Sequence, residues 1–64
     1  MSLNTAPNIP DPDEFYAELL RAHEGLGDEE SVAFNARLVL ILANHIGDPA
    51  VLSAALVAAK KGDT

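Results

Sequence analysis

Hydrophobic and polar positions along this 64-residue chain follow a helical period in three stretches, each bounded by residues that start or stop helices. The first stretch opens with Asp11, which fits the N-cap, and Pro12, which fits the first helical position. Glu14 stands three residues after Asp11, where a side chain can reach back as in a capping box. Gly25 fits the position just after a helix. We therefore predict a helix over about 12–24.

The second stretch begins as soon as the first has ended. Asp28 can act as its N-cap, and Glu29 and Glu30 suit the positive end of the helix dipole. Gly47 is suited to end it. These signals predict a helix over about 29–46.

The third stretch repeats the start of the first, because Asp48 and Pro49 again place a cap before a proline. Two lysines occupy the last turn, where positive charge is favourable, and Gly62 follows them. The predicted helix spans about 49–61. No alternating pattern of useful length indicates a strand.

The linkers between the predicted helices are short, which favours antiparallel neighbours. We therefore predict an all-α fold, a small three-helix bundle formed by a single domain over 11–62. Pro7 and Pro10 predict that residues 1–10 form an extended or flexible arm, since proline fixes its own φ and disfavours helix before it. Residues 1–3 are left out of this fold prediction because they also fit a vector-derived start.

The second predicted helix is apolar on nearly all sides, as central helices are. The third is short and rich in alanine, so it makes a narrow cover; its alanines are equally explained as good helix formers on an exposed side. Together the two helices carry more apolar surface than a monomer of this size can hide. We therefore predict self-association, most simply as a two-fold dimer. The candidate interface residues are Phe34, Arg37, Leu38, Ile41, Asn44 and His45.

Glu30, Arg37 and Asn44 lie seven residues apart, so they follow one edge of the second helix. One interpretation is a solvated edge or a network within the bundle. The other makes Arg37 and Asn44 anchors at a subunit or partner interface, because polar groups in interfaces can fix register.

The chain has ten acidic residues against four basic ones and a net charge of −6. Such a charge repels phosphate backbones and anionic lipid, so we expect neither nucleic-acid nor membrane binding. Eight of the ten acids lie between 11 and 30, and six of these belong to the two helix starts. The apolar stretch 32–46 is too short to cross a bilayer. With no export signal visible, we expect a cytoplasmic protein.

Side chains able to do chemistry are sparse. His23 and His45 share no metal-ligand spacing, and the expected role for each is capping a helix end or packing. The chain has no cysteine, no serine, threonine or tyrosine with an adjacent base arranged like a triad, and no phosphate-binding glycine loop. We therefore expect no catalytic residue, no metal and no cofactor, and no enzyme activity of the chain alone.

Several motifs resemble a family of short bacterial proteins, the domain of unknown function 2783. They are Asp11-Pro12-Asp13-x-Phe15-Tyr16, Ala22-His23-x-Gly25-Leu26, Asn35-Ala36-Arg37-Leu38-Val39-Leu40 and Leu42-Ala43-Asn44-His45-Ile46-Gly47-Asp48. The resemblance covers residues 9 to 59 and implies no activity, cofactor or catalytic residue. Members are often encoded near flavin-dependent aromatic hydroxylases, which implies, by analogy, a small accessory subunit or regulator.

Three hypotheses follow. The first is a helical protein-interaction module, either a homodimer or the accessory subunit of a larger enzyme. The second is a ligand-binding or catalytic protein whose site forms between subunits, around His23, Arg37, Asn44 and His45. The third, a nucleic-acid regulator, is disfavoured by the charge and by the absence of a basic stripe on any predicted helix.

Overall fold

A computed structural model describes residues 3–62 and contains three helices: α1 (Pro12–His23), α2 (Asp28–Ile46) and α3 (Pro49–Lys61). No strand occurs among the described residues. The all-α, three-helix class predicted from the sequence is confirmed. The helix bounds differ from the predicted ones by one residue at the end of α1 and one at the start of α2.

Two aspartates cap helices as their positions predict. The Asp11 side chain accepts a hydrogen bond from the backbone N–H of Glu14 at 3.1 Å, at the start of α1. At the start of α3, Asp48 accepts from the backbone N–H of Ala50 at 2.9 Å. In both cases proline occupies the first turn, where its missing N–H leaves no bond unmade.

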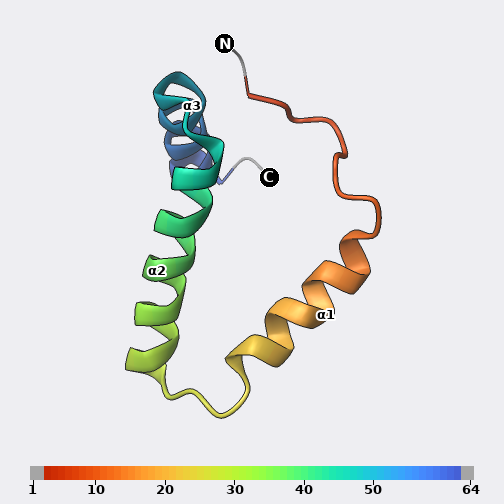
Figure 1. Ribbon diagram of the computed structural model, residues 1–64, viewed down its shortest axis with the longest axis vertical. Coiled ribbons are helices and arrows are strands. Elements are labelled where there is room, and N and C mark those ends of the chain that lie inside the picture. The colour runs from red at the N-terminus through yellow and green to blue at the C-terminus, as the bar shows by residue number, and fades with distance from the viewer. Residues whose placement is uncertain (1–2, 63–64) are drawn as a thin grey trace.

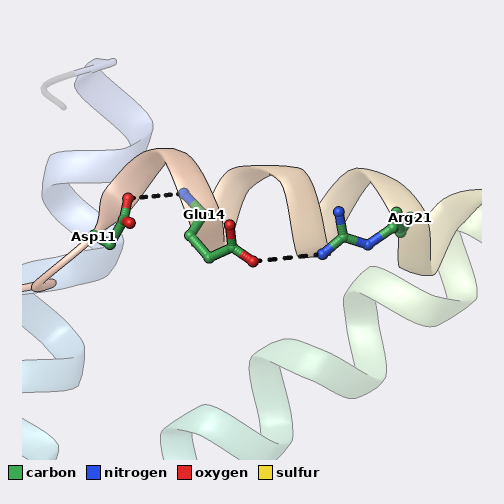
Figure 2. A network of polar contacts seen from close by, with 3 residues as sticks. All are labelled: Asp11, Glu14 and Arg21. Carbon is green, nitrogen blue, oxygen red and sulfur yellow. Dashed lines mark hydrogen bonds and ion pairs between the residues drawn. The ribbon is translucent and has the colours of Figure 1, made fainter.

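The reciprocal half of the capping box at α1 is not formed, which corrects the role predicted for Glu14. Its carboxylate instead points along the helix to Arg21, with Oε1 3.8 Å from the guanidinium Nη2 (Figure 2). The two residues are seven positions apart, two turns along one face. The cap at Asp11 therefore rests on a single side-chain hydrogen bond.

The N-cap of α2 is Gly27, not Asp28 as predicted. Gly27 is extended, with φ −75° and ψ 175°, and its backbone N–H donates to Oε1 of Glu30 at 3.0 Å. Because Glu30 reaches back to Gly27, the first turn closes one residue earlier than the aspartate suggests. Asp28 then lies in the first turn, where its charge suits the helix dipole.

Glycine ends α2 as predicted. Gly47 has φ 73°, a left-handed conformation that side chains disfavour, and its N–H donates to the Ala43 carbonyl at 2.9 Å. Gly25 has a similar φ of 81° after α1, where the N–H of Leu26 donates to the His23 carbonyl at 3.2 Å. The chain therefore reverses at two glycines.

The helices form an open arrangement (Figure 1). From the loop that joins them, α1 and α2 diverge like the two arms of a V, and α3 lies against the far end of α2. Residues 3–11 precede α1 without helix or strand and run as an arm away from the loop. The first two residues of the predicted arm lie outside the described residues.

No side chain among residues 3–62 is fully buried. The accessible surface is 5581 Å², whereas a compact protein of this mass exposes about 3,900 Å². The radius of gyration is 13.2 Å, compared with about 11 Å for a compact domain of this length. The single chain therefore has secondary structure but no interior.

Large apolar side chains are correspondingly exposed, most of all on α2. The exposed fraction is 70% for Val32 and Leu40 and 64% for Ile41. The others are Ile9, Phe15, Tyr16, Leu20, Val39, Leu42, Ile46, Leu56 and Val57. Scattered apolar residues are normal on protein surfaces, but eleven of these twelve side chains belong to three short helices.

Candidate protein interface

The point where α1 meets α2 is held by His23, in the last turn of α1. Its ring meets the ring of Phe34 edge-to-face, with centroids 4.7 Å apart and planes at 66°. The same ring lies within hydrogen-bond distance of Asn35, with Nε2 3.0 Å from Oδ1. Nδ1 donates to the carbonyl of Leu19 at 2.9 Å, because a carbonyl can only accept. His23 thus packs and bonds at a helix end, the kind of role predicted for it.

The bond between His23 and Asn35 has two forms. With Nδ1 protonated, a neutral imidazole accepts at Nε2, and Asn35 then presents its amide N–H after a half-turn. An imidazolium donates from both nitrogens and keeps the amide oxygen as acceptor. Both forms connect the end of α1 to the second turn of α2.

Next to this vertex, four side chains of α2 line a shallow hollow of about 130 Å³. They are Phe34, Arg37, Leu38 and Ile41. Phe34 and Leu38 are half-buried, whereas Ile41 is exposed. Because Phe34 touches α1, the hollow opens on the side of α2 that faces into the V. Four of the six candidate interface residues therefore surround one apolar depression.

The other two candidates, Asn44 and His45, lie farther along α2 and do not line the hollow. Both are exposed. Ten residues of helix separate Asn35, the partner of His23, from His45, which is about 15 Å of axial rise. The four residues of the between-subunit site hypothesis therefore do not converge within one chain. That hypothesis requires a second molecule.

The polar line along α2 is also divided. Glu30 is engaged with the backbone of Gly27, so it takes part in the start of the helix. Arg37 borders the hollow, and Asn44 is exposed in the last turn of α2. The ion pair found among the described residues joins Glu14 to Arg21 and does not involve this line. Arg37 thus offers a cation beside an apolar surface.

Phe34 was predicted only as an interface candidate, and neither its contact with His23 nor the bond of His23 to Asn35 was predicted from the sequence. A usable signal was present. The last turn of one helix and the first two turns of the next meet across a short loop, so a histidine before Gly25 and an amide near the start of α2 are natural partners.

Residues 3–62 contain neither a metal-binding cluster nor a membrane-spanning helix. No cluster of three or more His, Asp or Glu side chains is arranged to hold a metal ion there. Within the same part of the chain, no helix combines the length and apolar character needed to cross a membrane.

Fold and surface together define a small, acidic, all-α protein with an open apolar face between two diverging helices. Residues 3–61 match a protein family described as "Protein of unknown function (DUF2783)". The chain belongs to this family, as its motifs suggested. Comparison with curated proteins and with solved structures gave no match in either set.

Proposed function

We propose that this chain is a helical protein-interaction module, with a binding role and not a catalytic one. The observation that supports the proposal is the absence of a fully buried side chain among residues 3–62, while large apolar side chains of α1 and α2 remain exposed. Burial of apolar surface is the main favourable term in folding and association. A face left open within the chain is therefore suited to another protein surface.

The shape of the face supports the same function. The hollow beside Phe34 is smaller than the roughly 300–1,000 Å³ of usual small-molecule sites and is shallow. Its lining includes an aromatic residue and an arginine, both types that are enriched in protein interfaces, together with two aliphatic residues.

Two kinds of partner fit this function. One is a second copy of the chain, which would make the protein a homodimer. The other is a larger enzyme, for which the chain would be an accessory subunit or regulator. The family resemblance suggests a flavin-dependent aromatic hydroxylase as that enzyme. Both partners use the same apolar face, so one experiment on that face tests the function before the partner is known.

The test is site-specific photo-crosslinking in cells, in the cytoplasm that we propose as the compartment. A benzoylphenylalanine replaces Ile41, which borders the hollow, or, as a matched control, Glu18, which is exposed and lies about 140° around α1 from His23. We expect a discrete protein adduct from position 41 and none from position 18. Equal adducts from both positions, or none from a folded protein, would contradict the proposed function.

A further inference from the structure

The inner side of α2 carries a stripe of four residues, three of them apolar, whose spacing is the same in both chain directions. Phe34, Leu38, Ile41 and His45 are separated by four, three and four residues. At about 100° per residue these positions lie within a narrow sector of the helix, the spacing of a coiled-coil seam. A stripe with symmetric spacing matches a second copy of itself when the two helices run antiparallel.

The structure leaves this stripe accessible at its centre. Phe34 is covered in part by His23 at the vertex. Beyond the vertex α1 diverges from α2 (Figure 1). Leu38 and Ile41 border the open hollow on α2. On α1, Tyr16 and Leu19 share one face of the helix with His23, at helical spacing. The V therefore presents two apolar sides with room between them.

Electrostatics permits two such faces to meet despite the net charge of −6. No aspartate or glutamate occurs between Glu30 and Asp48, so the face of α2 has no acid along its length. The acids of the chain lie mainly on α1 and at the start of α2. Arg37 is the single charged side chain of the segment. Because the segment has no acid, two such faces meet without the repulsion that acidic faces would create.

The exposed area also matches a dimer. The chain exposes about 1,700 Å² more than a compact protein of its mass, part of it on the arm. A standard interface buries about 800 Å² on each partner. Each chain therefore has enough surplus surface for one interface of standard size.

We propose that the occupant of the V is a second copy of this chain, with the two α2 helices antiparallel across a two-fold axis. This inference rests on the proposed function and names its partner. Phe34 of one chain then lies opposite His45 of the partner subunit, and Leu38 opposite Ile41 of the partner subunit. Arg37 flanks Asn44 of the partner subunit on one side of the seam, so the two polar anchors meet between chains.

A two-fold arrangement satisfies both molecules at once. The stripe of each chain lines its own V and also packs into the V of the other chain. The assembly is therefore complete with two chains. A single foreign helix would fill one V without needing the symmetric spacing of the stripe. The core that each chain lacks is formed between the two chains, and α1 of each copy covers one flank.

Light scattering of the purified protein over a dilution series gives the first test. We expect twice the chain mass of 6.7 kDa, falling on dilution. Leu38→Ala should weaken the dimer by about 30-fold, because it removes a leucine from the centre of the seam. Leu40→Ala is the matched control: it makes the same chemical change two residues away on the opposite side of α2 and should alter the dimer less than about threefold.

A disulfide trap tests the register, and it is clean because the chain has no cysteine. Leu38→Cys and Ile41→Cys proteins are prepared separately, then mixed and oxidised. The antiparallel pairing predicts a disulfide-linked heterodimer with one chain of each variant. Oxidised alone, neither variant should crosslink efficiently, because neither position lies opposite itself.

Each outcome is decisive. Efficient crosslinking of Leu38→Cys alone would indicate a parallel pair and overturn the proposed register. A wild-type dimer equally weakened by both alanine variants, or not trapped in the mixture, would place the contact elsewhere and overturn the proposal. A monomer at all concentrations that still gives the position-41 adduct with another protein would overturn the second copy alone. A folded monomer with no adduct would overturn the proposed function as well.

Discussion

The junction between α1 and α2 and the junction between α2 and α3 use similar local signals and give different packing. Each has a glycine with positive φ after one helix and an N-cap before the next. Across the two-residue turn 47–48, α3 folds back against α2. Across the four-residue loop 24–27, α1 meets α2 at its end and then diverges (Figure 1).

Side-chain size explains much of this difference. The half-buried residues of α3 are mostly small, which lets its backbone come close to α2 where the two helices meet; they are Val51, Leu52, Ala54, Ala55 and Ala58. At the first junction, two large rings, those of His23 and Phe34, occupy the vertex where the helices meet. Capping residues therefore determine where helices begin and end, whereas the side chains between them determine whether they close. The open junction is the half for which we propose a partner.

The largest expected effect comes from removing the aromatic ring at the open junction. Phe34→Ala should lower the free energy of unfolding by about 2–3 kcal/mol, less than for a fully buried ring because Phe34 is half-buried. Urea unfolding at fixed protein concentration measures it. Leu56→Ala, on the exposed side of α3, is the control and should cost below about 0.5 kcal/mol. Equal losses would mean that the junction does not depend on this ring.

The closed junction is tested at its glycine. Gly47→Ala places a Cβ at φ 73° and should cost about 1 kcal/mol, measured by thermal unfolding. Gly27→Ala is the matched control, because φ there is −75° and the added Cβ would make an ordinary contact 3.6 Å from Oε1 of Glu30. It should cost no more than about 0.5 kcal/mol. A larger loss at Gly27 would show that the start of α2 matters more than the turn into α3.

The hydrogen bond at the vertex should contribute less than the ring. Asn35→Ala is expected to cost about 0.5–1.5 kcal/mol, the usual range for one hydrogen bond. A double-mutant cycle with His23→Ala separates the hydrogen bond between His23 and Asn35 from the edge-to-face contact of His23 with Phe34. Additive losses in the cycle would show that the two side chains do not stabilise each other.

The smallest effect is expected on the outer surface of α1. Arg21→Ala removes an ion pair between two exposed side chains at 3.8 Å and should cost a few tenths of a kcal/mol, vanishing in high salt (Figure 2). Chemical denaturation with urea at low and high ionic strength checks this. A loss above about 1 kcal/mol that persists in salt would mean that Arg21 packs against α2 in the assembled protein.

The sequence predicted what local chemistry controls. Asp11 and Asp48 cap their helices because the cap is made within three residues, and the glycine stops follow from backbone freedom that few other residues share. The predictions for Glu14 and Asp28 were wrong because each position offered a competing partner: Arg21 two turns on for Glu14, and a glutamate that reached Gly27 at the start of α2.

The angle between α1 and α2 was beyond local signals. It depends on how His23 and Phe34 meet across the loop and on what fills the space where the helices diverge. The surplus of apolar residues on α2 did indicate an unfilled surface, and the structure exposes it. The candidates Asn44 and His45 have no place in a site within one chain, because their proposed neighbours belong to another molecule.

The central claim is that the core of this protein forms between chains, and the concentration dependence of thermal unfolding tests it most directly. Circular dichroism would follow the helices through unfolding at protein concentrations over a hundredfold range. Because folding and association are coupled, the account predicts a midpoint temperature that rises steadily with concentration. A sharp, cooperative transition at the same temperature throughout the range would contradict it, since the isolated chain would then be stable without a partner.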